Sequence, residues 1–218
     1  MIKIFYLSLN TLTPQKINYL KKFVSIDTLN QVKNYKSQAI QQNKIIGEAM
    51  IRILLEKYFG IKDANIKKTI YGKPYVDNNN VFFNISHSGE YIICAISNQQ
   101  IGVDIEKIGK NKMHVAHRFF HINEINILKK LNEKAQTNVF FKLWSAKESY
   151  IKYTGSGLST PLSDFEIVLE TQQAHIQQNT TKIKVHLQEC HIDNEYYCFI
   201  CSDSLESTYP ELFPINII

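Results

Sequence analysis

The stretch VFFNISHSGEYIICAISNQQIGVDIEKI, residues 81–108, decides the fold. It holds short runs rich in β-branched and aromatic residues, separated by the turn clusters HSGE and NQQ. Such runs predict strands, and links this short leave no room for a helical crossover. Together with the upstream run IKKTI and the turns YGKP and DNNN, they predict an antiparallel meander over residues 66–108.

Helical patterns lie on both sides of this region. Upstream, apolar residues recur on one stripe over residues 38–58, and Gly60 follows as a helix stop. Downstream, a helical pattern covers residues 113–153 with a break near residues 121–123. We expect Thr137 to cap the clearest helix of this downstream region.

The same order of elements occurs twice. Three strand-like runs, DFEIVLE, TKIKVHL and EYYCFICS, follow the downstream helices, and the proline-broken YPELFPINII is expected to pack as an arm without regular structure. Helices followed by strands, twice over, predict an α+β protein with two comparable halves. We place the halves at residues 1–100 and 101–218, the second including the C-terminal arm.

Composition limits the class of protein. Hydrophobic residues make up 44% and charged residues 21% of the 218, which is typical of a packed globular protein. The net charge of +5 suits a partner that carries phosphates or carboxylates, but no basic stripe alternates with exposed aromatics as single-strand nucleic-acid binding requires. The opening MIKIFYLSL reads as a strand rather than a signal peptide, and no apolar run is long enough to cross a membrane. We therefore expect a cytoplasmic protein without nucleic-acid or membrane partners.

Two carboxylates stand out in IGVDIEKI. On a strand, Asp104 and Glu106 share one face, with about 7 Å between them along the chain. One explanation of such a pair is a solvated outer face of the sheet. The other is a magnesium site, because Mg²⁺ needs only a few carboxylates and takes its other ligands from water and substrate phosphates.

The helix WSAKESYIK carries a second charged group. Glu148 and Lys152 lie along one face, and Lys147 lies about 100° round from Glu148. An ordinary surface ion pair between residues four apart explains this pattern. A third carboxylate with two ammonium groups also suits a metal–pyrophosphate site, where cations offset phosphate charge.

Two turn residues complete the candidates. His87 lies between two serines in FNISHSGEY, and Lys73 lies in YGKPY. Either residue is common in an ordinary turn, and either is also able to donate a hydrogen bond to a phosphate oxygen.

In this order, GKP, FNISHS, GVDIE and WSAKESYIK resemble the motif set of the Sfp-like (surfactin-synthetase-type) phosphopantetheinyl transferases. The resemblance covers about residues 33–169 and includes RFF and GSGLSTPL. It implies two α+β halves related by a pseudo-two-fold axis, with the site between them. It also implies a Mg²⁺-dependent enzyme that moves the phosphopantetheine arm of coenzyme A (CoA) to a serine of an apo acyl or peptidyl carrier protein and releases 3',5'-ADP.

The resemblance assigns roles to individual residues. It implies Mg²⁺ ligands at Asp104, Glu106 and Glu148, and CoA contacts at Lys73, His87, Lys147 and Lys152. Glu124, after RFFHIN, matches a carboxylate proposed as general base in part of the family, and Lys152 is expected to stabilise the leaving group as well.

One position departs from the family pattern. The family usually has an arginine four residues before the glycine of GEAMIR, where this chain has Asn43. Lys33, Lys36 and Lys44 are the candidates for gripping the CoA 3'-phosphate instead, as point charges rather than as a bidentate fork.

Other interpretations remain open at this point. A family-like protein without activity would bind CoA or a carrier only. A metal site on a helix face with His114, His117 and His121 is a second alternative. Cys198 and Cys201 have the spacing of zinc ligands, but residues three apart on a strand point to opposite faces, which favours buried free thiols. We expect a monomer. The sequence does not determine the carrier, the pathway, the tolerance of acyl-CoA donors or the choice between Mg²⁺ and Mn²⁺.

Overall fold

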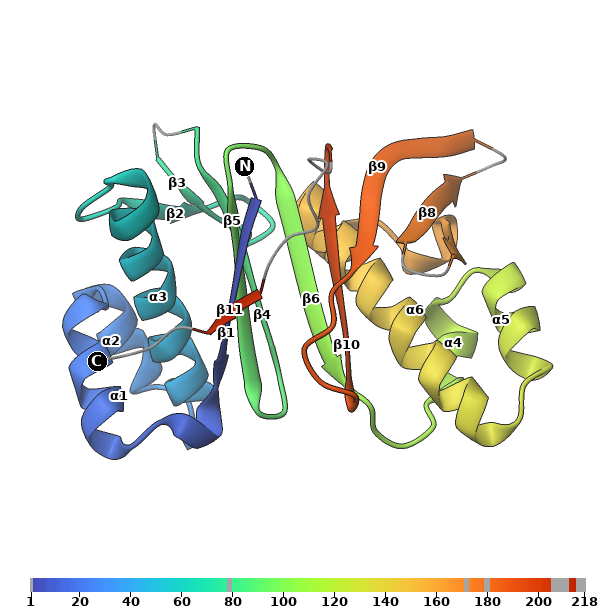
Figure 1. Cartoon of the computed structure of the whole chain (residues 1–218), viewed down its shortest axis with the longest axis horizontal. Helices are drawn as coiled ribbons and strands as arrows, with labels where there is room; N and C mark the ends of the chain where they lie inside the picture. The colour runs from blue at the N-terminus through green and yellow to red at the C-terminus, as the bar shows by residue number, and fades with distance from the viewer. Residues whose placement is uncertain (1, 78–79, 171–172, 179–180, 205–211, 215–218) are drawn as a thin grey trace.

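The structure is a computed structural model that describes residues 2–77, 80–170, 173–178, 181–204 and 212–214. Within these ranges the chain repeats one order of α-helices and strands (Figure 1). The first half comprises β1 (Ile2–Ser8), α1 (Pro14–Leu20), α2 (Ile26–Val32), α3 (Gln38–Phe59), β2 (Ile66–Lys68), β3 (Pro74–Val76), β4 (Phe82–Ser88) and β5 (Tyr91–Ser97). The second half comprises β6 (Ile101–Lys107), α4 (Met113–Phe119), α5 (Ile122–Lys129), α6 (Glu133–Thr154), β7 (Glu166–Leu169), β8 (Gln173–Gln178), β9 (Thr181–Glu189) and β10 (Tyr196–Ser202). This repetition confirms the α+β class with two similar halves.

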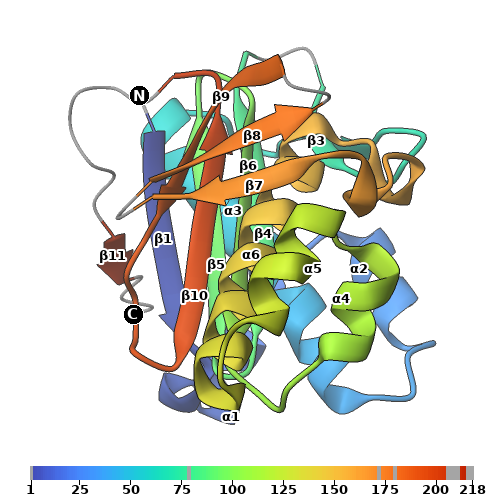
Figure 2. The same cartoon turned by 90° about the vertical axis from the view of Figure 1, so that its right-hand side faces the viewer.

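The layers run helix, sheet, sheet, helix. One sheet has the order β11-β1-β5-β4, where β11 is Leu212–Pro214, and the other has the order β6-β10-β9-β8-β7. Helix α3 covers the outer face of the first sheet and α6 that of the second, with α4 and α5 outside α6 (Figures 1 and 2). An apolar core joins the inner faces of the sheets; its fully buried members include Ile4, Ile93, Ile101, Val103 and Ile200.

The two long helices explain much of the repetition. Each of α3 and α6 has 22 residues and ends at a left-handed glycine, Gly60 and Gly155 respectively, as expected for a helix stop. The predicted helix over residues 38–58 is thereby confirmed. The expected cap at Thr137 is wrong, because Asn132 accepts the hydrogen bond from the backbone N–H of Ala135 at 3.0 Å while Thr137 donates back to the helix.

The predicted meander is wrong in two respects. Strands β4 and β5 form the expected hairpin, but β6 pairs antiparallel with β10, and β2 and β3 form a small sheet of their own. The reason is that β5 already has β1 on one edge and β4 on the other. No edge of β5 is left for β6, so the chain crosses to a new sheet.

Two further differences concern the C-terminal region. The polar run QAHIQQ forms β8, which the sequence pattern missed, and part of the expected arm forms β11, which pairs parallel with β1 of the first half. Cys198 lies in the core between the sheets and Cys201 in the core beneath α6, which confirms opposite faces and free buried thiols.

Candidate active site

A cavity of about 1280 Å³ lies between the two halves. Its walls come from α2, α3, β2 and β4 of the first half and from β6 and α6 of the second. The predicted site residues that line it are Lys44, His87, Asp104, Glu106, Glu148 and Lys152. The other predicted residues, all within the described part of the chain, do not border it: Lys33, Lys36, Lys73, Glu124 and Lys147.

Close contact between α6 and β6 brings residues from distant parts of the chain together. A Cβ atom on Gly102 would lie 2.1 Å from the carbonyl oxygen of Ser149 and 2.3 Å from the backbone nitrogen of Tyr153. Only glycine therefore permits this approach of backbone to backbone. The Ser145 hydroxyl also donates to the carbonyl of Asp104 at 3.0 Å. As a result, the face of α6 that carries Glu148 lies beside the carboxylates of β6.

Side chains of β4 hold β6 from the other side. Asn84 accepts from the N–H of Val103 at 2.9 Å, the hydroxyl of Ser86 donates to Asp104 at 2.8 Å, and that of Ser88 donates to Glu106 at 3.2 Å. These three residues share one face of the strand, as alternation requires. Our sequence interpretation singled out only His87 in this segment. The polar residues at every second position were the signal that it missed.

Asp104 is the most constrained carboxylate of the cavity. Its side chain is almost fully buried, and Oδ1 accepts from Lys152 Nζ at 2.6 Å and from Ser86. Its Oδ2 has no hydrogen-bond partner. A buried carboxylate oxygen without a partner is costly, so this atom is poised to accept a cation or a donor from a ligand.

The carboxylates of Glu106 and Glu148 are affected by the charge of Asp104. Burial and the charge of Asp104 raise the pKa of Glu106 to about 7, and the same two causes raise the pKa of Glu148. Lys152 lies with Asp104 rather than forming the surface pair with Glu148 that the helix spacing allowed. Burial and the charge of Asp104 thus disfavour the ionised forms of Glu106 and Glu148, and a bound cation would oppose both effects.

The acidic residues do not form a finished metal cluster. Across the described ranges, no three histidine, cysteine, aspartate or glutamate side chains are gathered closely enough to hold a metal ion on their own. Mg²⁺ does not need such a cluster, since it keeps waters and binds substrate phosphates beside one or two carboxylates. The oxygen donors, and above all the unpartnered Oδ2 of Asp104, therefore fit Mg²⁺. The alternative site at His114, His117 and His121 gains no support, and His121 instead caps α5.

His87 is accessible within the cavity. Desolvation by the protein atoms around it, followed by the positive charge of Lys152, lowers its pKa below the ordinary value. Its imidazole is therefore neutral at pH 7 and able to donate one hydrogen bond.

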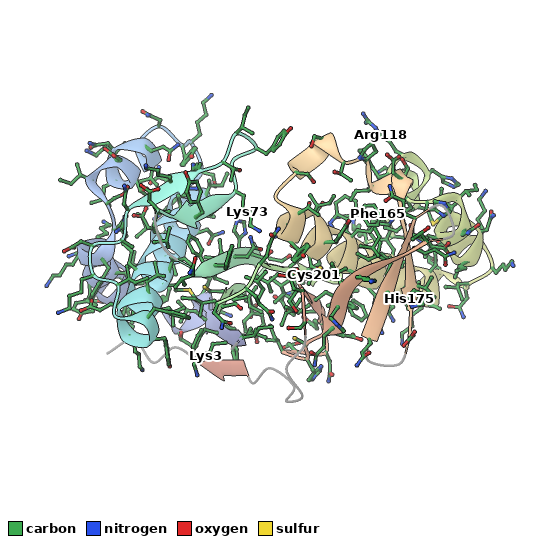
Figure 3. All side chains as sticks on the ribbon, turned by 90° about the horizontal axis from the view of Figure 1, so that it is seen from above. Lys3, Lys73, Arg118, Phe165, His175 and Cys201 are labelled. Atoms are coloured by element: carbon green, nitrogen blue, oxygen red, sulfur yellow. The ribbon has the colours of Figure 1, made fainter. Side chains whose placement is uncertain are left out.

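Lys73 links the halves instead of lining the cavity (Figure 3). Its Nζ donates to the carbonyls of Tyr153 at 2.8 Å and Ile101 at 3.2 Å, at the end of α6 and the start of β6. Burial lowers its pKa to about 8. In this arrangement both hydrogen bonds hold the β2–β3 turn against the second half.

Glu124 and Lys147 form an ion pair inside the second half. The Glu124 oxygen lies 2.9 Å from Lys147 Nζ, and neither side chain is exposed to solvent. Glu124 also accepts from the N–H groups of His121 and Ile167, and Lys147 donates to the carbonyls of Leu162 and Phe165.

The position of this pair follows from helix geometry. A residue about 100° round α6 from Glu148 faces the core rather than the cavity. Burial raises the pKa of Glu124 and lowers that of Lys147, and the attraction between the two charges opposes both shifts. The predicted roles of general base for Glu124 and CoA contact for Lys147 thus gain no support from this geometry.

Lys33 and Lys36 are exposed away from the cavity, and Lys33 donates to Asn30 at 3.0 Å. Of the three lysines considered for the 3'-phosphate, only Lys44 borders the cavity.

No described helix is both long enough and apolar enough to span a membrane.

Comparisons with known proteins agree with the motif set. Residues 100–201 match the 4'-phosphopantetheinyl transferase superfamily, and residues 11–99 match a family described as 4'-phosphopantetheinyl transferase, N-terminal.

The transferase gsp of Aneurinibacillus migulanus is 35% identical over 205 residues, which are 93% of this chain and 86% of the relative. The transferase Sfp of Bacillus subtilis is 31% identical over 184 residues, 83% of this chain and 82% of the relative. A solved holo-(acyl-carrier-protein) synthase from Bacillus anthracis, in complex with CoA (3',5'-ADP), matches 47% of this chain and 93% of its own with 24% identity and a TM-score of 0.40. Because of its two family matches and its identity of 35% to gsp over 93% of its length, the chain belongs to the 4'-phosphopantetheinyl transferase superfamily.

Proposed function

We propose that this protein transfers the phosphopantetheine arm of CoA to a serine of an apo acyl or peptidyl carrier protein and releases 3',5'-ADP. The observation that carries the proposal is the unpartnered, buried Oδ2 of Asp104 in a cavity lined by two further carboxylates, Glu106 and Glu148. Membership of the superfamily supports the same reaction.

We propose that Asp104, Glu106 and Glu148 hold Mg²⁺ together with the substrate pyrophosphate. When bound, the ion supplies positive charge that offsets the phosphate charges. The contact of Lys152 with Asp104 supports the proposal that its ammonium group stabilises charge that develops on the departing phosphate. The neutral imidazole of His87 is suited to donate a hydrogen bond to a phosphate oxygen.

The attacking serine must lose a proton, because a hydroxyl is a weak nucleophile at neutral pH. The family resemblance names Glu124 as the base, but that carboxylate is buried and engaged with Lys147 and two backbone N–H groups. A water molecule in the cavity is the second candidate for the proton acceptor.

We also propose a cytoplasmic monomer whose halves divide at residues 100 and 101. The four free cysteines suit a reducing compartment. The proposed boundary falls between β5 and β6, which belong to different sheets.

The test is a mass measurement on a carrier protein. Purified protein is incubated with CoA, Mg²⁺ and each of a panel of apo carriers, and we expect the carrier to gain the mass of one phosphopantetheinyl group. Glu148→Ala should abolish the gain while leaving the circular dichroism spectrum unchanged.

A carrier whose acceptor serine is replaced by alanine is the control for the site of attachment. If no carrier gains mass although calorimetry shows that CoA binds, the protein is a CoA-binding relative without transferase activity. Near-normal turnover by Glu148→Ala would remove that residue from the proposed metal site.

A further inference from the structure

The two carboxylates of β6 differ in how firmly the protein holds them. Asp104 accepts hydrogen bonds from Lys152 and Ser86. Glu106 accepts one, from the hydroxyl of Ser88 to its Oε2 at 3.2 Å, and no other described residue donates a hydrogen bond to this carboxylate. The orientation of Glu106 therefore depends on a single hydroxyl of the other half of the chain.

The hydroxyl of Ser88 has a second contact that fixes its own orientation. Its oxygen accepts from the backbone N–H of Lys107 at 3.0 Å, one residue beyond Glu106 on β6. A serine hydroxyl has one hydrogen to donate and two lone pairs to accept with. Because Lys107 engages a lone pair, the hydrogen remains available for Glu106. Ser88 thus binds the main chain and the side chain of two consecutive residues of β6.

The turn that follows Ser88 is held by the second half as well. Gly89 has a φ of 54°, and a Cβ atom there would lie 2.5 Å from the hydroxyl oxygen of Tyr196 on β10. The same hydroxyl accepts from the N–H of Glu90 at 3.0 Å, and the ring of Tyr91 packs edge-to-face on that of Tyr196 with 4.9 Å between centroids. These contacts fix the end of the β4–β5 hairpin against β10, so Ser88 reaches β6 from a rigid support.

We propose that Ser88 is a positioning residue, whose hydroxyl orients the Glu106 carboxylate for the divalent cation. The first half of the chain would then support a metal site whose carboxylates all belong to the second half. This inference rests on the proposed function, which makes Glu106 a ligand of Mg²⁺. A hydrogen bond to Oε2 restricts the rotation of the carboxylate, while Oε1 receives no hydrogen bond from any described residue. Removing a supporting contact of this kind typically costs about 10–100-fold in metal affinity.

The experiment measures the affinity for the ion separately from turnover. Mg²⁺ is titrated calorimetrically into protein saturated with CoA, without a carrier, for the wild type, Ser88→Ala and Ser88→Thr. We expect Ser88→Ala to raise the dissociation constant of Mg²⁺ about tenfold, and Ser88→Thr, which keeps the hydroxyl, to stay within about threefold of the wild type. The dissociation constant of CoA in the absence of Mg²⁺ should change less than about twofold, because Ser88 acts through Glu106.

Ser97→Ala is the matched control. Ser97 is a buried serine of β5 at the opposite end of the same hairpin, accepts from the N–H of Gln99 at 3.0 Å and does not line the cavity. Its loss should leave the affinity for Mg²⁺ unchanged. Circular dichroism checks that each variant is folded, and Ser88→Cys, whose thiol is a weak donor, replaces Ser88→Ala if the latter does not fold.

Steady-state kinetics give a second measurement. Ser88→Ala should raise the KM for Mg²⁺ about tenfold, while kcat at saturating Mg²⁺ stays within about threefold of the wild type. A purely structural role would instead lower kcat per total protein and leave the KM for Mg²⁺ unchanged.

An unchanged dissociation constant of Mg²⁺ in folded Ser88→Ala would overturn the inference. An equal loss in Ser97→Ala, or a Ser88→Thr variant as weak as Ser88→Ala, would overturn it too, since the effect would then come from the fold and not from the hydroxyl. A tenfold loss of Mg²⁺ affinity in Ser88→Ala, with no transfer to any carrier by the wild type, would uphold the inference and refute the proposed function.

Discussion

The buried pair of Glu124 and Lys147 permits a test that separates stability from catalysis. Replacing Lys147 by Met removes the only side-chain cation that contacts the Glu124 carboxylate among the described residues. Replacing Glu124 by Gln keeps the shape of the side chain but places an amide where two backbone N–H groups and an ammonium group all donate to a carboxylate. Both changes leave a charge in the core without its partner.

The size of the loss follows from this burial. Breaking a buried ion pair by removing one partner costs about 3–5 kcal/mol, and we expect Lys147→Met to fall in this range. For Glu124→Gln we expect about 3 kcal/mol, because the retained oxygen still accepts one of the donors while another is left unsatisfied. The double variant should lose less than the sum of the single losses, because each single change already breaks the same contact.

The assay has two parts. Unfolding in urea gives the free energy of unfolding of each variant, and steady-state kinetics gives kcat and KM for CoA, scaled to the folded fraction. If the pair holds α5, α6 and β7 together, stability falls while kcat per folded molecule stays within about threefold of the wild type. If Glu124 is the general base, Glu124→Gln lowers kcat by about 10²–10⁴ with little change in KM. Unchanged stability with such a loss of kcat would refute our reasoning.

Two other predictions concern β6. Gly102→Ala should destabilise the protein by about 3 kcal/mol or more and should abolish transfer. The reason is that the added Cβ atom would overlap the backbone of α6, which cannot rotate away as a side chain can. Chemical denaturation measures the loss of stability. Gly109→Ala is the control, as its Cβ would meet Phe141 at an ordinary 3.5 Å, and an equal loss there would contradict the argument. Another prediction concerns Glu106, whose pKa is raised to about 7 in the folded chain. The unfolded chain releases this proton near pH 4.5, whereas the folded chain still keeps it there. The metal-free protein should therefore lose stability as the pH rises from about 4.5 to 7. Glu106→Gln should reduce this loss, leaving the part that comes from the raised pKa of Glu148, and added Mg²⁺ should raise the melting temperature of the wild type more at pH 8 than at pH 6. A pH profile that is the same for both proteins would contradict the assignment.

Local patterns in the sequence were sufficient for several elements of this structure. Helix α3 has an apolar stripe and ends at Gly60, and both signals lie within the helix itself or one residue beyond it. The hairpin of β4 and β5 likewise depends on a turn at Gly89 between two apolar runs. The repeated order of elements predicted two halves, and the ordered motifs around Asp104 and Glu148 indicated the superfamily.

Other features depended on contacts between distant residues. The partner of β6 is β10, about ninety residues away, and no local signal reports that both edges of β5 are occupied. Thr137 and Asn132 are both good capping residues, and the folded helix begins at Glu133 with Asn132 as its cap.

By itself, then, the sequence determined the secondary structure with strong periodicity, the α+β class and the residues capable of acid and phosphate chemistry. Only the tertiary structure decided which of those residues meet. Lys147 turned into the core toward Glu124, and Lys152 paired with Asp104 of β6 rather than with Glu148 on its own helix. The physical reason is that side-chain type and helical or strand period are local properties, whereas burial and the pairing of charges depend on which surfaces the folded chain brings into contact.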